Sequence, residues 1–265
     1  MWTEPLTLTI SLFLAQAFFA LIFTYLVKGF YHDHNNKFFF FWILSWGTFA
    51  IQFIGSSLVA LEGMWFEFDH VVSLMVVFVT TVSSYFQILF LFVGFYELAF
   101  RRHFPVSSLR VLILSTIVLS AVLVMLFFKG EENESLRTLF RLGIKEFFCG
   151  LFFSICALLI LLYRSASMAM RFVMGSFLLY GGAQFHYLFY HLSLFLSIDY
   201  LFNPVYLGVI DLFLIVLIGV GLVMTVLATI FQEMRGVASQ TAIKASTRGL
   251  SGRVWPRRVY SPPRF

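Results

Sequence analysis

The sequence predicts an all-α fold, a polytopic transmembrane bundle of seven helices with the N-terminus outside and the C-terminus in the cytoplasm. The chain is 60% hydrophobic and only 12% charged, whereas about a quarter of the residues of soluble proteins are charged. Apolar runs of about twenty residues or more, the length that crosses a bilayer as an α-helix, recur along it. The expected spans are Leu6–Lys28, Lys37–Leu61, Val71–Phe100, Leu109–Phe128, Leu136–Arg164, Ala169–Leu196 and Pro204–Glu233.

The charges of the loops predict the orientation, because Lys and Arg near helix ends resist translocation and stay cytoplasmic. The first, third and fifth loops carry Lys28, Lys37, Arg101, Arg102, Arg110, Arg164 and Arg171. The opposite side carries Glu4, Glu62, Glu67, Asp69, Glu131, Glu132, Glu134 and Asp199, with Lys129 and Arg137 as its basic residues. We therefore expect a multi-pass membrane protein. The first run follows a start without basic residues, so we expect it to be retained instead of cleaved as a signal peptide.

The chain is predicted to hold two parts, a seven-helix domain over residues 1–235 and a basic, disordered cytoplasmic tail over residues 236–265. The basic residues after Glu233 are Arg235, Lys244, Arg248, Arg253, Arg257, Arg258 and Arg264. The segment has no apolar periodicity, which favours disorder. Its charges are expected to lie against anionic lipid headgroups, at about 1 kcal/mol each. No nucleic-acid-binding fold accompanies them, so no nucleic-acid partner is predicted.

Polar side chains inside the last three spans form the candidate site. They are Arg141, Lys145, Glu146, Gln184, His186, His191 and Asp211. The predicted orientation places them all in the outer half of the bilayer, where charges are expected to pair and to face the bundle interior or a water-filled cavity. We therefore predict a ligand pocket between these spans, with Arg141 and Lys145 as cationic contacts, Glu146 and Asp211 as counter-charges, and the other three as hydrogen-bonding groups. Two alternatives remain open: the same groups only join the helices, or they form a proton or ion path.

Neither a metal site, a cofactor nor an enzymatic activity is predicted. His186 and His191 are spaced i,i+5, which places them on different faces of one helix, and haem held between His191 and His70 is the remaining alternative. Cys149 and Cys156 are seven residues apart in one span, roughly 10 Å, which is too far for a disulfide. Motifs of hydrolases and nucleotide-binding proteins are missing, and the last span lacks the Lys that retinal requires.

Small and amide residues in the spans are expected to serve helix packing. They include Gln16, Gln52, Gly55, Ser56, Ser57, Gly175, Gly181, Gly182, Gly219 and Gly221. The glycines of the last two spans could instead provide a bend that transmits ligand binding.

Three motifs resemble the seven-helix sensor modules of bacterial signalling proteins. They are Phe-Trp-Ile-Leu-Ser-Trp-Gly at Phe41–Gly47, the stretch Gly94–Arg102 and the exit Phe231–Arg235. The likeness covers residues 5–235, and it implies a module that is followed by a histidine kinase or diguanylate cyclase domain. After Arg235 the chain departs from that pattern, since it has no phosphoacceptor His box and no Gly-Gly-Asp-Glu-Phe motif. The resemblance therefore implies sensing without an output domain.

The expected function is a non-catalytic membrane sensor or receptor-like module of signal transduction. Its expected partners are membrane lipids, a small amphiphilic ligand, a separate kinase or cyclase, and a second copy of the chain. The alternative is a small proton-coupled transporter or channel-like protein that uses Glu146, Asp211 and the histidines. The apolar stretches 152–160 and 218–226 argue against it, because a transport path should stay polar through the inner half of the bilayer.

Overall fold

The computed structural model describes residues 3–34, 36–62, 68–100, 102–127, 136, 138–162, 168–196, 198 and 204–251, and these residues form seven α-helices. The helices are α1 (Thr3–His34), α2 (Lys37–Glu62), α3 (His70–Phe100), α4 (Val106–Phe127), α6 (Ile144–Leu162), α7 (Met168–Leu196) and α8 (Pro204–Ser251). A short π-helix, η1 (Leu139–Gly143), leads directly into α6. The predicted all-α fold is thus confirmed, with each expected span forming a helix.

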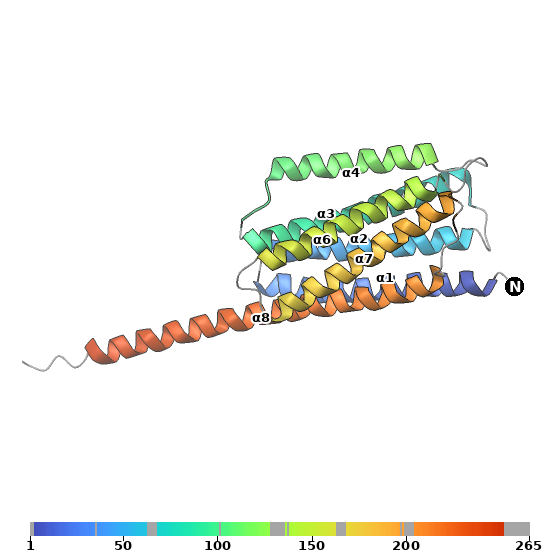
Figure 1. Ribbon diagram of the computed structural model, residues 1–265. Helices are drawn as coiled ribbons and strands as arrows, with labels where there is room; N and C mark the ends of the chain where they lie inside the picture. The colour runs from blue at the N-terminus through green and yellow to red at the C-terminus, as the bar shows by residue number, and fades with distance from the viewer. Residues whose placement is uncertain are drawn as a thin grey trace, which may run out of the picture. The chain divides into compact units, whose positions relative to one another are not determined.

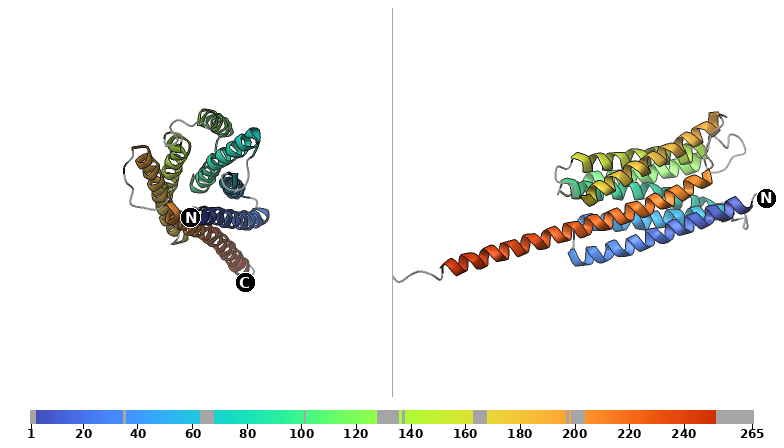
Figure 2. Two further views of the ribbon diagram at one scale, coloured as in Figure 1. Left: turned by 90° about the vertical axis from the view of Figure 1, so that its right-hand side faces the viewer. Right: turned by 60° about the horizontal axis from the view of Figure 1, so that its bottom comes forward.

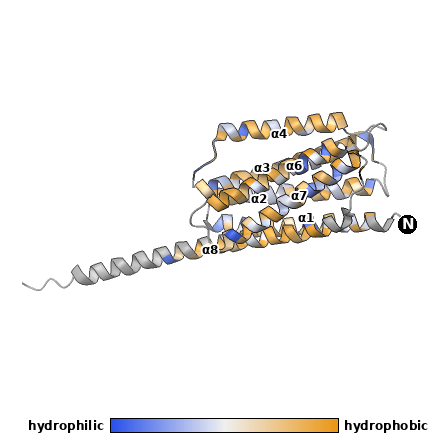
Figure 3. Ribbon diagram, in the orientation of Figure 1, coloured by the Kyte–Doolittle hydropathy of each residue, from blue (hydrophilic) through white to orange (hydrophobic). Residues whose placement is uncertain are grey.

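Six helices in the described part of the chain are long and apolar enough to cross a membrane. Hydrophobic residues, coloured orange, dominate the coloured parts of these helices in Figure 3. The exception is α7, which was expected to form a span and whose Tyr, His and Gln residues lower its hydropathy. Many large apolar side chains are exposed on the helices, among them Phe18, Met125 and Phe213. Lipid would cover them, because soluble proteins rarely expose apolar surface on this scale.

Part of the sequence evidence for orientation lies outside the described residues. The residues concerned are Arg101, Arg164, Glu67, Lys129, Glu131, Glu132, Glu134, Arg137 and Asp199, together with Arg253, Arg257, Arg258 and Arg264 of the tail. The orientation with the N-terminus outside therefore stays a prediction.

The chain divides into two compact units, Met1–Thr225 and Val226–Phe265. In the first unit the helices lie side by side with roughly parallel axes (Figures 1 and 2). The second unit contains the last part of α8, which continues to Ser251. This helix extends beyond residue 236, where the sequence predicts disorder, because extending an existing helix costs far less than starting one. Residues 252–265 lie outside the described part, and their disorder stays a prediction.

Helix α3 is the most buried of these six helices. In its most apolar stretch of 18 residues, 61% of the residues are buried, against 17% in the corresponding stretch of α4. Helix α2 packs against α1 and α3, α6 packs against α3 and α7, and α4 contacts α3 and η1. Helix α4 therefore lies at the periphery, and the other helices surround the interior that holds the polar side chains.

Glycines permit close approach between several helices. A Cβ atom on Gly150 of α6 would lie 3.1 Å from the carbonyl oxygen of Gly181 on α7, and a Cβ atom on Gly181 would lie equally close to the carbonyl oxygen of Gly150. A Cβ atom on Gly55 would likewise meet the side chain of Thr80 on α3, and one on Gly219 would meet the ring of Phe23 on α1. The expected packing role is thus confirmed at Gly55, Gly181 and Gly219.

Four fully buried rings from four helices form an aromatic layer in the interior. It consists of Trp42 on α2, Phe95 on α3, Phe153 on α6 and Phe177 on α7. Successive ring centroids lie 5.2 Å apart from Trp42 to Phe95, 4.9 Å from Phe95 to Phe177 and 5.1 Å from Phe177 to Phe153. Edge-to-face and tilted rings at these distances pack favourably.

Candidate functional site

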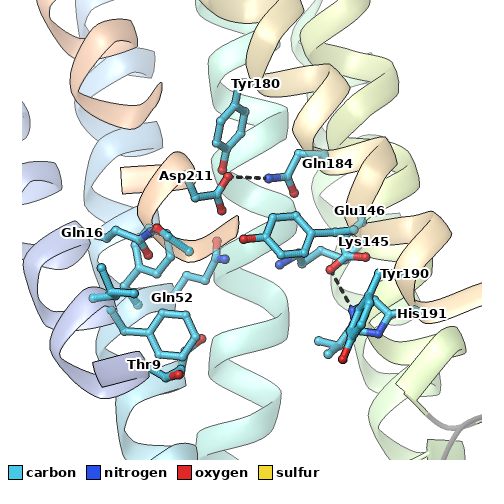
Figure 4. Close-up of a pocket in the computed structure, with 17 residues that line it drawn as sticks. Thr9, Gln16, Gln52, Lys145, Glu146, Tyr180, Gln184, Tyr190, His191 and Asp211 are labelled. Carbon is cyan, nitrogen blue, oxygen red and sulfur yellow. Dashed lines mark hydrogen bonds and ion pairs between the residues drawn. The ribbon is translucent and has the colours of Figure 1, made fainter. Parts of the chain in front are cut away.

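A cavity of about 290 Å³ lies within the first unit, between α1, α2, α6, α7 and α8 (Figure 4). Its polar wall residues are Thr9, Gln16, Gln52, Ser56, Lys145, Glu146, Tyr180, Gln184, Tyr187, Tyr190, His191 and Asp211. Leu12, Phe13, Phe53 and Leu142 contribute apolar surface. Small-molecule sites combine apolar surface with convergent polar groups, and their volumes begin at about 300 Å³. The size of the cavity therefore suits a small organic molecule.

The π-helix η1 precedes the charged residues of the wall. Its five residues end at Gly143, and the first turn of α6 then presents Lys145 and Glu146 to the cavity. Single π-helical turns occur frequently at functional sites. The turn also has a geometric effect, because it contains more residues than an α-helical turn. Arg141 lies in this turn and is not part of the described wall, whereas Lys145 follows in α6 and lines the cavity.

Glu146 and His191 form a buried pair that joins α6 to α7. The Nε2 atom of His191 lies 3.2 Å from Oε1 of Glu146, and their side chains are 10% and 7% exposed, respectively. Oε2 of Glu146 and Nδ1 of His191 are buried and have no hydrogen-bond partner among the described residues. The pair thus keeps one unsatisfied atom on each side chain at the cavity wall.

Asp211 is held by an amide across the helix interface. Nε2 of Gln184 on α7 donates to Oδ1 of Asp211 on α8 at 3.3 Å. On the opposite wall, Nε2 of Gln16 on α1 donates to the backbone carbonyl of Gly208 on α8 at 3.4 Å. These two hydrogen bonds connect α8 to the helices on both sides of it. The position of α8 is therefore coupled to the polar groups of the cavity.

Lys145 brings a positive charge to the cavity. No described carboxylate lies within 4.0 Å of its Nζ atom, so it makes no close ion pair. Figure 4 shows the ammonium group on the same side of the cavity as Glu146. Lys145 and the carboxylates of Glu146 and Asp211 thus face one space and can respond together to a charged ligand.

One face of α7 supplies much of the wall. Tyr180, Gln184, Tyr187 and His191 follow each other at spacings of three or four residues, the repeat of one helix face. His186 lies outside this repeat and does not line the cavity among the described residues. The polar residues that lower the hydropathy of α7 are therefore largely those that form the cavity.

Five of the seven predicted site residues meet at the cavity. They are Lys145, Glu146, Gln184, His191 and Asp211. Arg141, in η1, and His186 are not part of the described wall. The structure thus brings five of the seven residues together, and the predicted roles of Arg141 and His186 stay predictions. The predicted pocket between the last three spans also lacked part of the wall, because residues of α1 and α2 line the cavity as well.

The residues that sequence reasoning missed come from α1, α2 and the tyrosines of α7. Gln16, Gln52 and Ser56 were expected to serve helix packing, and Thr9 was given no role. These side chains are neutral, so a single sequence does not distinguish them from polar residues that serve helix packing. A usable signal existed for Tyr180 and Tyr187, since both share a helix face with Gln184 and His191.

Two smaller spaces continue from the cavity toward the aromatic layer. The first is bordered by Gln52, Gln87 and Tyr180, among others, and the second by Ser45, Trp46 and Phe153. Each has a volume of about 10 Å³, close to the minimum that a single water molecule needs. The ring of Tyr180 lies 4.6 Å from that of Phe153, which belongs to the aromatic layer. The two spaces are therefore far smaller than the cavity of about 290 Å³.

The described residues contain no group of three or more His, Cys, Asp or Glu side chains that could hold a metal ion. Cys149 and Cys156 are both buried and unpaired, as their spacing predicts. The polar groups of the cavity are thus suited to binding through hydrogen bonds and charge. No protein-family model, curated protein sequence or solved structure matches this chain.

Proposed function

We propose that this chain is a non-catalytic, receptor-like module of a bacterial inner membrane that binds a small ligand in the cavity and signals through α8. The observation that carries the proposal is the convergence of Lys145, Glu146 and Asp211 on a cavity of about 290 Å³ inside an otherwise apolar bundle. Charged groups within membrane-spanning helices are costly and as a rule functional. The N-terminus lies outside in this proposal, so the ligand enters from the outer side.

The coupling between ligand and output rests on α8. Its residues Gly208 and Asp211 are hydrogen-bonded to α1 and α7 at the cavity wall. A ligand that competes for these polar atoms changes the contacts of α8 with its neighbours. The same helix continues to Ser251, so its far end is the natural point of contact for a separate kinase or cyclase.

A covalent occupant of the cavity tests this proposal without a known ligand. Ser56→Cys would be modified with benzyl methanethiosulfonate in the full chain in lipid nanodiscs, with Leu58→Cys, on the exposed side of α2, as the matched control. We expect modification at position 56, and not at 58, to change backbone hydrogen exchange in residues 226–251. Equal exchange in both modified variants would contradict signalling through α8.

The second candidate is a proton-coupled transporter, and one observation favours it. The buried Glu146–His191 pair has the composition of a proton relay. Against it stands the aromatic layer, whose rings pack with centroids 4.9 Å and 5.1 Å apart and would oppose the passage of a solute. Proton or solute flux in proteoliposomes that disappears in Asp211→Asn would favour the transporter and reject the receptor.

A further inference from the structure

Three polar groups of the cavity wall are open to its interior and have no partner among the described residues. They are the ammonium group of Lys145 on α6, the Oδ2 atom of Asp211 on α8 and the side-chain amide of Gln52 on α2. In the described part of the chain these atoms make no hydrogen bond, and they do not belong to the buried atoms that lack one. The three side chains extend toward the same space (Figure 4). A ligand in the cavity can therefore contact all three groups.

The Glu146–His191 pair does not offer such contacts. Oε1 of Glu146 and Nε2 of His191 are bonded to each other, and their remaining polar atoms, Oε2 and Nδ1, are buried and do not open onto the cavity. Gln16 is similar, because its amide nitrogen donates to the carbonyl of Gly208 and its Oε1 atom is buried. The polar atoms that a ligand meets are therefore the same for either protonation state of His191.

The two charged groups that are open to the cavity have opposite signs. Lys145 supplies a positive charge and Asp211, when ionised, a negative one, and no oxygen of Asp211 lies within 4.0 Å of the Lys145 ammonium. Direct contact therefore does not neutralise either charge. Inside a helix bundle a charge without a partner is unfavourable. A ligand that carries both an ammonium group and a carboxylate can pair with Asp211 and Lys145 at the same time.

Hydrogen-bonding groups next to these charges favour the same ligand. Nε2 of Gln184 donates to Asp211, which leaves the Oε1 atom of Gln184 as a second acceptor for an ammonium group. The amide nitrogen of Gln52 is a donor that suits a carboxylate. Gln52 and Lys145 border the same small space beside the cavity, so both can reach one carboxylate. Each charged end of the ligand thus finds a charge and an amide.

Apolar side chains from two other helices accommodate the rest of the ligand. Leu12 and Phe13 on α1 and Phe53 on α2 line the cavity. The rings of Phe13 and Phe53 are stacked, with centroids 6.0 Å apart and an interplanar angle of 27°. Such rings offer apolar surface to an aliphatic or aromatic group. The cavity therefore combines paired charges on α6 and α8 with apolar surface on α1 and α2.

We propose that the cavity binds an amino acid with an apolar or aromatic side chain. Its carboxylate contacts Lys145 and Gln52, and its ammonium group contacts Asp211 and Gln184. An ammonium group beside Asp211 also favours the ionised form of that carboxylate. This inference names the ligand class of the receptor and so rests on the proposed function.

Three probes with the same aromatic body test the requirement for two charges. The full chain in lipid nanodiscs is titrated calorimetrically with L-phenylalanine, with 2-phenylethylammonium, which lacks the carboxylate, and with 3-phenylpropanoate, which lacks the ammonium group. Empty nanodiscs are subtracted, and the unfolding temperature reports stabilisation. We expect L-phenylalanine to bind about tenfold or more tightly than either analogue. An analogue that binds as tightly as L-phenylalanine would overturn the inference.

Two variants assign each charge of the ligand to its partner. Lys145→Met should weaken L-phenylalanine binding about tenfold or more and leave the affinity for 2-phenylethylammonium within about twofold. Asp211→Asn should weaken L-phenylalanine binding to a similar degree and leave 3-phenylpropanoate binding unchanged. Lys28→Met and Asp33→Asn are the matched controls, because both residues are exposed and lie outside the cavity wall.

The variants are compared only when their unfolding temperature shows that they are folded. A folded Lys145→Met or Asp211→Asn chain that binds L-phenylalanine with unchanged affinity would contradict the assigned contacts. If one variant does not fold, the other variant and the three probes on the unmodified chain decide.

The failure of the ligand class and the failure of the receptor are distinguishable. Preferential binding of the cation or the anion that depends on cavity residues would reject the amino acid and leave the receptor proposal in place. If none of the three probes binds a folded chain, the ligand class is rejected. If, in addition, Ser56→Cys modification leaves α8 unchanged, the receptor proposal is rejected with it.

Discussion

Nε2 of His191 and Oε1 of Glu146 lie 3.2 Å apart, and this contact joins α7 to α6 at the wall of the cavity. The two residues are 45 positions apart in the chain, so the contact depends on the helix arrangement and not on local sequence. The contact holds the two side chains at hydrogen-bonding distance, and one further atom of each has no hydrogen-bond partner among the described residues. The pair therefore contributes both to the packing of α6 on α7 and to the chemistry of the cavity.

Removing the imidazole should destabilise the chain. His191→Leu leaves the Glu146 carboxylate buried without a partner, which should lower the free energy of unfolding by about 1–3 kcal/mol. The double variant Glu146→Leu/His191→Leu should recover part of this loss, because it removes both polar groups. Thermal unfolding in detergent micelles measures both. His103→Leu is the control, since the His103 side chain is 72% exposed and its contact with Glu97 contributes little. Equal losses in the His191 and His103 variants would contradict a structural role of the pair.

Two adjacent glycines in α7 should respond in opposite ways to the same change. A Cβ atom at Gly181 would lie 3.1 Å from the backbone oxygen of Gly150, whereas one at Gly182 meets nothing within 4 Å. Gly181→Ala should therefore cost about 1–3 kcal/mol of stability through overpacking. Gly182→Ala should be neutral or stabilise by up to about 1 kcal/mol, because alanine favours the helix. Unfolding temperatures of the two variants compare the effects, and equal temperatures would refute the close contact of α6 with α7.

Neighbouring serines in α2 should differ in chemical accessibility. Ser56 lines the cavity, while Ser57 is 2% exposed and donates to the carbonyl oxygen of Phe53. We expect 2-aminoethyl methanethiosulfonate to react with Ser56→Cys at least about tenfold faster than with Ser57→Cys, since buried thiols are inert. The buried Cys149 and Cys156 give a low background. Mass spectrometry follows the modification, and comparable rates would show that the cavity is closed to water.

The orientation can be tested with two exposed aspartates at opposite ends of the first three helices. Asp33 lies near the end of α1 and Asp69 lies just before α3. If the N-terminus is outside, a membrane-impermeant maleimide added to intact spheroplasts should label Asp69→Cys and spare Asp33→Cys until the membrane is permeabilised. The reverse pattern would show that the spans run in the opposite direction and that the cavity faces the cytoplasm.

The charged part of the cavity could be predicted from the sequence, because a charge within an apolar helix is conspicuous. Lys145, Glu146 and Asp211 are of this kind, and they line one cavity. Arg141 does not line the cavity, and nothing in the sequence announces the π-helical turn that contains it. His186 does not line it either, and it lies on a different face of the helix from Gln184 and His191.

The contribution of α1 and α2 could not be predicted from one sequence. Gln16 and Gln52 are neutral side chains in apolar helices, and they gain meaning only when the neighbours of α1 and α2 are known. Hydropathy defines the spans but does not order them around the bundle. The number of helices was therefore accessible from the sequence, whereas the wall facing α6, α7 and α8 was not.

The low hydropathy of α7 has a consequence for biogenesis. A segment that is too polar to partition into lipid alone enters a bilayer together with helices that shield its polar face. Because that face carries Tyr180, Gln184, Tyr187 and His191, we expect α7 to insert together with α6, to which it is joined by the Glu146–His191 contact. Variants that make this face more lipophilic should therefore ease insertion while removing the polar lining of the cavity.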